Sequence, residues 1–185
     1  MRTIGHHTCS KDGGEQYVRD NAPFKSIRKE GYVPFLGEGY YYWDNNIGAS
    51  QKWGKTHYKD SYFIIKSDLE LPGEIFFDLV GNRDHMIKIQ EHGNSFKKKN
   101  PQRKDWTVGV IIQSLKKLNR LEEYKGIFPY QAIRAIDTSK TPPSHATVKF
   151  VEGKEEYTNL APILDIPLIL TTQFRRNVTS DSASN

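Results

Sequence analysis

The stretch that organises this chain reads Leu36-Gly37-Glu38-Gly39-Tyr40-Tyr41-Tyr42-Trp43-Asp44. Gly37 and Gly39 permit a positive φ or a close backbone approach that residues with a Cβ resist. The aromatic run that follows alternates across a short strand and presents rings on both of its faces. Taken alone, the segment is typical of a glycine turn that leads into an aromatic core strand.

The segments on either side of this stretch form an ordered series. Upstream, His6-His7-Thr8 closes a first strand, and a helix is expected over residues 16–30. Pro23 should split that helix, with a second piece over residues 23–29. Downstream, a short helix over residues 47–53 has Asp44 or Asn45 as its cap and ends at Trp53.

The remainder of the chain alternates between strand and helix patterns. Leu and Ile recur at helical spacing over residues 105–124, and Asp105 is the expected N-cap. Strands rich in β-branched and aromatic residues are expected at 61–66, 132–136, 146–151 and 166–174. Strands near both ends with helices between them predict an α+β fold.

Composition limits the class of protein. The chain has 185 residues, of which 36% are hydrophobic, 12% aromatic and 26% charged, so it fits one globular domain. We expect this domain over residues 1–176, with a disordered Ser- and Asn-rich tail at 177–185. A single cysteine, Cys9, excludes an internal disulfide framework and fits a reducing, cytoplasmic compartment. No apolar run is long enough to predict a membrane partner.

The formal charge of +5 weakly favours an anionic partner. The densest positive segment is expected to be an exposed loop, and it contains Lys97, Lys98, Lys99, Arg103 and Lys104. This loop is either simply solvated or binds the phosphates of an acceptor. Lys116, Lys117 and Arg120 on the next helix would extend such a patch.

The series from His6 to Trp53 resembles the ADP-ribosyltransferase family, in its diphtheria-toxin-like and poly(ADP-ribose)-polymerase-like branch. His6-His7-Thr8 is similar to the family's His-Gly-Ser/Thr element, with His7 in place of glycine. Residues 37–42 are similar to its Gly-x-Gly-x-Tyr-Phe element. The resemblance implies a split β-sheet core with flanking helices.

The resemblance also implies which residues bind NAD⁺ and act on it. His6 and Tyr41 would be catalytic, and the NAD⁺-binding residues would be His6, His7, Thr8, Gly39, Tyr41 and Trp53. Aromatic faces hold the flat, cationic nicotinamide by stacking and cation–π attraction. A third catalytic residue would polarise the nicotinamide ribose; Gln173 is the first choice, and the alternatives are Asp165, Glu156 and Gln131. No metal is implied.

The implied activity is that of a mono-ADP-ribosyltransferase toxin that cleaves NAD⁺ and modifies a macromolecule. The positive charge favours nucleic acid, RNA or DNA, over protein as the acceptor. Toxin relatives in toxin–antitoxin and phage-defence systems imply an antitoxin partner. Two alternatives stay open: an NAD⁺ glycohydrolase that uses water as acceptor, and a non-catalytic RNA-binding module with residues 40–43 as a stacking platform.

Overall fold

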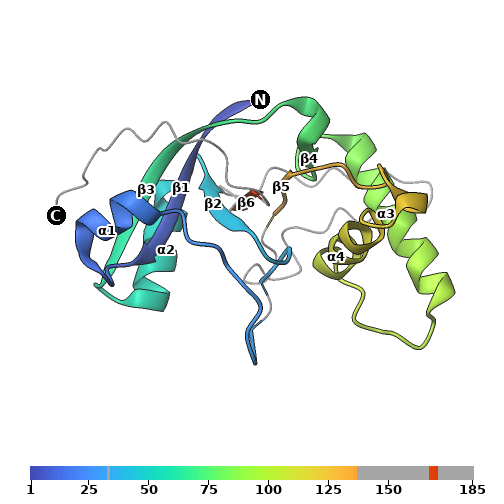
Figure 1. Ribbon diagram of the computed structural model, residues 1–185, viewed down its shortest axis with the longest axis horizontal. Coiled ribbons are helices and arrows are strands. Elements are labelled where there is room, and N and C mark those ends of the chain that lie inside the picture. The colour runs from blue at the N-terminus through green and yellow to red at the C-terminus, as the bar shows by residue number, and fades with distance from the viewer. Residues whose placement is uncertain (33, 137–166, 171–185) are drawn as a thin grey trace, which may run out of the picture.

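The computed structural model describes residues 1–32, 34–136 and 167–170 (Figure 1). The strands of this part form one six-stranded sheet in the order β3-β1-β2-β6-β5-β4. They are β1 (Arg2–Ser10), β2 (Tyr40–Asp44), β3 (Tyr62–Glu70), β4 (Phe76–Asp78), β5 (Ala132–Arg134) and β6 (Pro167–Leu170). The helices of the same part are α1 (Gly14–Asn21), α2 (Ile47–Tyr58), α3 (Arg83–Lys99) and α4 (Val108–Leu118).

The α+β class is therefore confirmed. The described strands lie in one continuous sheet, so the expected division into two sheets is not seen among them. Most strand pairs are antiparallel, and the β4–β5 pair is parallel. The more specific expectation of an ADP-ribosyltransferase fold stays a prediction.

Strand β1 is the long element on which the N-terminal half is built. It pairs antiparallel with β3 over nine residue pairs, from Arg2–Glu70 to Ser10–Tyr62, but with β2 over only two. Beyond those two pairs β1 and β2 separate. Helices α1 and α2 lie at the β3–β1 end of the sheet, whereas α3 and α4 lie at the β4–β5 end (Figure 1).

The largest core cluster fills the space under α3 and α4. Leu36, Phe77, Ile112, Leu115 and Ile133 are completely buried in it. The helical spacing predicted for α4 is confirmed by the burial of Ile111, Ile112 and Leu115 on one face. Leu36, from the glycine turn, joins this cluster, so the turn is anchored to the core by its first residue.

A half-buried ionic network ties three strands together. Arg134 on β5 donates to both carboxylate oxygens of Asp78 on β4, at 2.9 and 2.6 Å, and to Asp44 at the end of β2 at 3.2 Å. Thr3 on β1 donates to the other oxygen of Asp44. Burial alone would raise the pKa of Asp78, but the hydrogen bonds from Arg134 and from the Val80 and Gly81 N–H groups lower it.

Several predicted boundaries were wrong. Helix α4 begins at Val108 with Thr107 as its cap, because Asp105 instead forms an ion pair with Arg103. Helix α2 is longer than expected and is capped by Asn46, whose side chain accepts from the Ala49 N–H at 2.9 Å. The segment after Pro23 is extended rather than helical.

Helix α3 was missed, and this changes the placement of the basic segment. Lys97, Lys98 and Lys99 form the last turn of α3 rather than a loop. Three cations are favourable there because they oppose the negative end of the helix dipole. Pro101, which signalled a loop, lies just after the helix end at Asn100.

The other predicted strands divide into two groups. Those at 61–66 and 132–136 are confirmed as β3 and β5, and Pro167 does begin a strand, β6. The strand at 146–151 and the tail at 177–185 lie outside the described residues.

Candidate functional site

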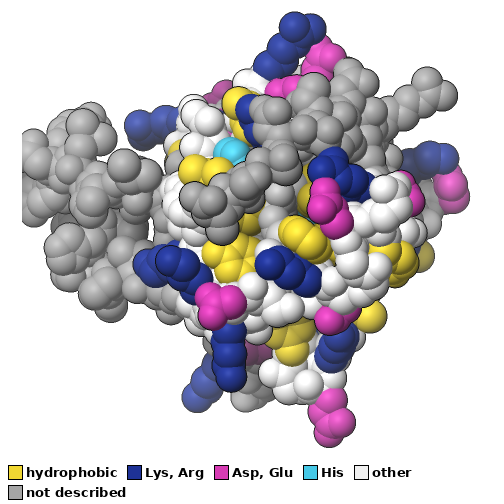
Figure 2. Space-filling model, turned by 90° about the vertical axis from the view of Figure 1, so that its left-hand side faces the viewer, with side chains coloured by type: hydrophobic (Ala, Val, Ile, Leu, Met, Phe, Trp, Pro, Cys, Tyr) yellow, Lys and Arg dark blue, Asp and Glu magenta, His cyan; other side chains and the backbone are white. Residues whose placement is uncertain are grey.

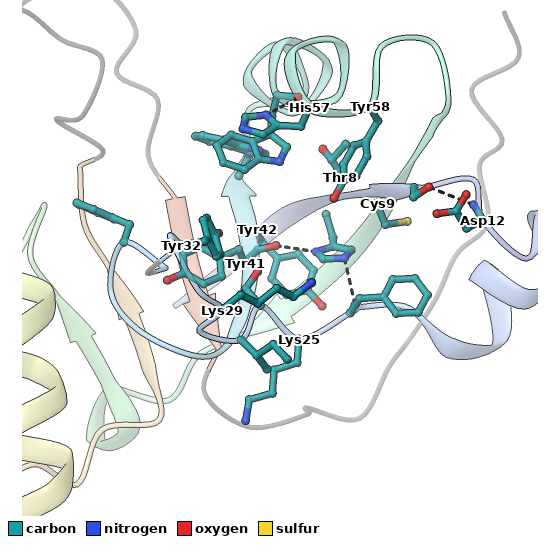
Figure 3. A pocket seen from close by; sticks show the side chains of 18 of the residues that line it. Thr8, Cys9, Asp12, Lys25, Lys29, Tyr32, Tyr41, Tyr42, His57 and Tyr58 are labelled. Atoms are coloured by element: carbon teal, nitrogen blue, oxygen red, sulfur yellow. Dashed lines mark hydrogen bonds between the residues drawn. The ribbon is translucent and has the colours of Figure 1, made fainter.

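A cavity of about 980 Å³ opens beside the point where β1 and β2 separate. Its described lining comes from the end of β1 and the loop after it, from α1, from β2, from α2 and from the segment between α1 and β2 (Figure 3). Eleven of the described lining residues carry aromatic rings: His7, Tyr17, Phe24, Tyr32, Phe35, Tyr41, Tyr42, Trp43, Trp53, His57 and Tyr58. The volume falls at the upper end of the range usual for small-molecule pockets, and the lining is predominantly aromatic.

His7 holds two walls of the cavity together. Its Nδ1 lies 2.8 Å from the Tyr41 carbonyl oxygen, and its Nε2 accepts from the Phe24 N–H at 3.1 Å (Figure 3). This arrangement defines the tautomer, with the proton on Nδ1. Burial lowers the pKa of His7, against the opposing effect of the Tyr41 carbonyl. His7 is therefore neutral, and both of its nitrogens are used in binding the chain itself.

Tyr41 fixes the glycine turn at the back of the cavity. Its hydroxyl accepts from the Leu36 N–H at 3.0 Å and donates to the Gly37 carbonyl at 2.7 Å. Gly37 has φ +96°, and a Cβ there would run into the Gln113 side chain of α4. Gln113 in turn donates to the Leu36 carbonyl at 2.8 Å. The hydroxyl of Tyr41 is thus structural, and what it offers the cavity is the ring.

Helix α2 supplies the opposite, aromatic wall. Thr8 on β1 donates to the Ser50 carbonyl at 2.9 Å, and the two hydroxyls lie 2.6 Å apart, which locks α2 onto the sheet. Trp53 lies 6.0 Å from Trp43 and stacks on His57 at 3.7 Å between ring centroids. One face of Trp53 is therefore covered by His57, and Trp53 also lines the cavity.

A hairpin forms the mouth of the cavity. Ser26 and Gly39 exchange backbone hydrogen bonds at 2.8 and 3.1 Å, and Lys29 and Tyr32 do so at 3.0 and 3.1 Å. We call the segment closed by the Ser26–Gly39 pair the cavity hairpin. It projects away from the sheet at the lower edge of Figure 1, and Lys29 and Tyr32 face the α2 wall across the opening (Figure 3).

The predicted site residues divide between the cavity and other places. His7, Thr8, Tyr41 and Trp53 all line the cavity. Gly39 is buried next to it, in the pair with Ser26.

His6 is not among the described lining residues. It lies in the middle of β1, buried, with no hydrogen-bond partner for Nδ1 in the described part, and burial lowers its pKa. A catalytic role for His6 stays a prediction; of the two histidines, it is His7 that lines the cavity.

The remaining predicted residues lie away from the cavity or outside the described part. None of Lys97, Lys98, Lys99, Arg103 and Lys104 lines it. Arg103 pairs with Asp105 at 2.6 Å and lies 4.7 Å from the centre of the Trp106 ring. Gln131 is exposed just before β5, and its N–H bonds the Ile75 carbonyl. Gln173, Asp165 and Glu156 lie outside the described residues.

Sequence reasoning missed three components of the cavity. Tyr58, at the end of α2, has a raised pKa because of burial and of neighbouring Cys9, Tyr32 and Asp12. Asp12 is the one carboxylate among the described lining residues. The cavity hairpin was mistaken for helix, although Gly31 and Pro34 are turn residues that could have indicated it.

One other proposal from the sequence can be compared with the structure. In the aromatic run suggested as a platform for an RNA-binding module, Tyr42 is only 4% exposed and packs in a core cluster, whereas Tyr40, Tyr41 and Trp43 are half-buried. The RNA-binding alternative stays a prediction. Cys9 is also buried, and burial raises the pKa of its thiol to about 11, so it is no activated nucleophile.

No protein-family model, curated protein or solved structure matches this chain. Among the residues the structure describes, no group of three or more His, Cys, Asp and Glu side chains is arranged to hold a metal ion. Within that same part, no helix has the length and apolar character needed to cross a bilayer.

Proposed function

We propose that this chain is an ADP-ribosyltransferase that holds NAD⁺ in the aromatic cavity and transfers ADP-ribose to nucleic acid. The observation that carries the proposal is the cavity itself, which brings together His7, Thr8, Tyr41 and Trp53 from three separate places in the sequence. The resemblance to the ADP-ribosyltransferase family implies an NAD⁺-binding role for all four, and also for His6, which is not among the described lining residues. Their convergence supports a common ligand.

The chemistry of the lining suits a dinucleotide. Flat rings such as nicotinamide and adenine gain from aromatic faces, and the cationic nicotinamide gains further from cation–π attraction. Tyr41 and Trp53 would supply those faces. Lys25, which lines the cavity, would act on the phosphates of NAD⁺.

In the proposed reaction, the bond between the ribose C1′ and the nicotinamide nitrogen breaks. Its electron pair leaves with nicotinamide, and an acceptor nucleophile forms a bond to C1′ and gives up a proton. The protein would stabilise the oxocarbenium-like transition state by placing a polar group near the ribose. Gln173 stays our first choice for that group, with Asp165, Glu156 and Gln131 as alternatives. An antitoxin that covers the cavity belongs to the same proposal.

The test is an assay with NAD⁺ labelled in the adenylate, in which single-stranded RNA, single-stranded DNA and protein are offered separately. We expect nicotinamide release together with transfer of the label to nucleic acid. A Trp53→Ala variant should lose most of this activity, whereas Tyr124→Ala, an exposed position outside the cavity, should retain it. Nicotinamide release without labelled acceptor would indicate the glycohydrolase instead. Label in protein alone would contradict the nucleic-acid acceptor.

A further inference from the structure

We infer that the cavity hairpin is the acceptor-binding surface and that it fits a single-stranded nucleic acid. The inference rests on the proposed transferase function, because a transferase must hold its acceptor beside the cavity that holds NAD⁺. It names a surface that the sequence did not indicate.

The first observation is that the hairpin presents large apolar side chains to solvent at the cavity mouth. Ile27 and Tyr32 are each 45% exposed and Phe35 is 37% exposed, and all three line the opening. Exposed aromatic rings beside a binding cavity offer stacking faces for bases, and such stacking tolerates any base. Figure 2 shows hydrophobic side chains gathered near the centre of the face that carries α1 and α2, with Lys and Arg side chains beside them.

The second observation is the charge of the same hairpin. Arg28 and Lys29 are exposed on it and Lys25 is exposed directly before it, against two carboxylates, Glu30 and Glu38. Glu38 lies 3.6 Å from the Lys25 ammonium, but Arg28 and Lys29 form no ion pair within the described part of the chain. Positive charges interleaved with exposed aromatic rings match the alternation of phosphates and bases along a single strand.

Helix α4 extends this positive region. Lys116 lies close enough to Lys25 and Arg120 for their charges to act on it, and burial together with those charges lowers the pKa of Lys116 to about 8. No carboxylate among the described residues forms an ion pair with Lys116. A bound phosphate would relieve the repulsion among these three cations.

The hairpin is also held in shape before any acceptor binds. The Ser26–Gly39 and Lys29–Tyr32 hydrogen bonds close it twice, and Gly31 takes the positive φ of +71° that its tight turn needs. Tyr32, at the hairpin tip, lines the cavity together with Tyr41 and Tyr58. A base stacked on Tyr32 would therefore lie next to the ligand. Bases in a duplex are not free to stack in this way, which favours a single strand.

The basic segment first indicated by the sequence is less suited to this role. Lys97–Lys99 end α3, which Figure 1 places at the opposite end of the sheet from α1 and α2. Arg103 is already engaged with Asp105 and Trp106. An acceptor bound there would be distant from the cavity.

The test measures binding without NAD⁺, by the fluorescence anisotropy of short labelled oligonucleotides of mixed sequence. We expect single-stranded RNA or DNA to bind and the matched duplex to bind more weakly. Tyr32→Ala combined with Phe35→Ala should raise the dissociation constant at least about fivefold. This factor corresponds to the lower end of the stacking energy that one base contributes. Arg28→Ser combined with Lys29→Ser should reduce the slope of the logarithm of the binding constant against the logarithm of salt concentration by about 1.4, because two phosphate contacts are lost.

The matched control is Leu121→Ala combined with Tyr124→Ala, which removes two exposed apolar side chains outside the cavity lining. It should bind like the unmodified chain. The inference is overturned if the Tyr32 and Phe35 variant binds normally, if a duplex binds as tightly as a single strand, or if Lys97–Lys99 variants alone lose binding. Hairpin-dependent binding without any nicotinamide release would overturn the transferase proposal but not the binding surface.

Discussion

The His7 side chain provides the sharpest prediction about how the cavity is built. Strand β1 pairs with β2 at only two positions, and the His7 imidazole continues the connection by bonding the Tyr41 carbonyl on β2 and the Phe24 N–H on the cavity wall. Replacing it by leucine leaves both backbone groups without their partner. Each buried unsatisfied group costs about 1–3 kcal/mol, so His7→Leu should lower the free energy of unfolding by about 2–6 kcal/mol.

A second variant separates hydrogen bonding from packing. His7→Gln places an amide oxygen where Nε2 accepts from Phe24, so it should recover one of the two bonds and lose only about 1–3 kcal/mol. Urea denaturation followed by tryptophan fluorescence and by circular dichroism measures both variants. If His7→Leu unfolds within about 0.5 kcal/mol of the unmodified chain, the range of a neutral surface change, the linking role is wrong.

The same bonds give a pH dependence with a defined sign. Burial holds the pKa of His7 below its unfolded value of about 6.5. Protonation would also turn Nε2 into a donor that faces the Phe24 N–H donor. The stabilisation is therefore complete above pH 6.5 and is lost as the pH falls below it. His6, His85 and His92 also have lowered pKa values, so they contribute to the pH dependence of stability as well. The contribution of His7 is the difference between the pH dependence of the unmodified chain and that of His7→Gln.

Three further predictions concern the turn, the ionic network and the aromatic wall. Gly37→Ala should destabilise the chain by more than about 1 kcal/mol in urea, because Gly37 has a positive φ and its missing Cβ leaves room for Gln113; unchanged stability would contradict that packing. Asp78→Asn should cost about 3–5 kcal/mol at neutral pH, because the Arg134 charge loses its bidentate partner. The pKa of Asp78 is lowered in the folded chain, so the ionised carboxylate contributes to the free energy of unfolding above about pH 4, and this contribution is lost as the pH falls below it. The destabilisation caused by Asp78→Asn should therefore become smaller in acid, and a destabilisation that is constant across pH would refute this. Trp53→Ala should weaken NAD⁺ binding by about 2- to 30-fold in a calorimetric titration, the range of a cation–π contact, whereas a loss confined to stability would give Trp53 a purely structural role.

Sequence patterns predicted the elements whose signals are local. The apolar spacing of Ile111, Ile112 and Leu115 and the β-branched residues of β3 lead directly to the elements observed. Helix α3 was not predicted because its buried face is narrow. Its buried residues are Ile89 and Gly93, and Lys and His residues stand on either side of them in the sequence. Such a helix depends on packing against α4, which no local pattern reports.

Most of the NAD⁺-binding residues that the sequence implied line the cavity, but the sequence did not predict how they are arranged around it. Tyr41, Trp53 and Thr8 were expected near one another, and they line one cavity. The choice between His6 and His7 depended on which face of β1 each side chain takes and on where β1 and β2 separate, and neither is visible in the sequence. The hairpin was missed because Pro23 was taken to start a helix, whereas the Ser26–Gly39 pairing that sets its shape joins residues far apart in the chain.

The central claim is that the aromatic cavity binds NAD⁺, and a fluorescence titration tests it most directly. Trp43 and Trp53 line the cavity and Trp106 does not, so a ligand there should quench part of the tryptophan emission. We predict saturable quenching by NAD⁺ that is reduced in Trp53→Ala and unchanged in Tyr124→Ala. The absence of saturable quenching and of calorimetric heat with NAD⁺ in the unmodified, folded chain would contradict the claim.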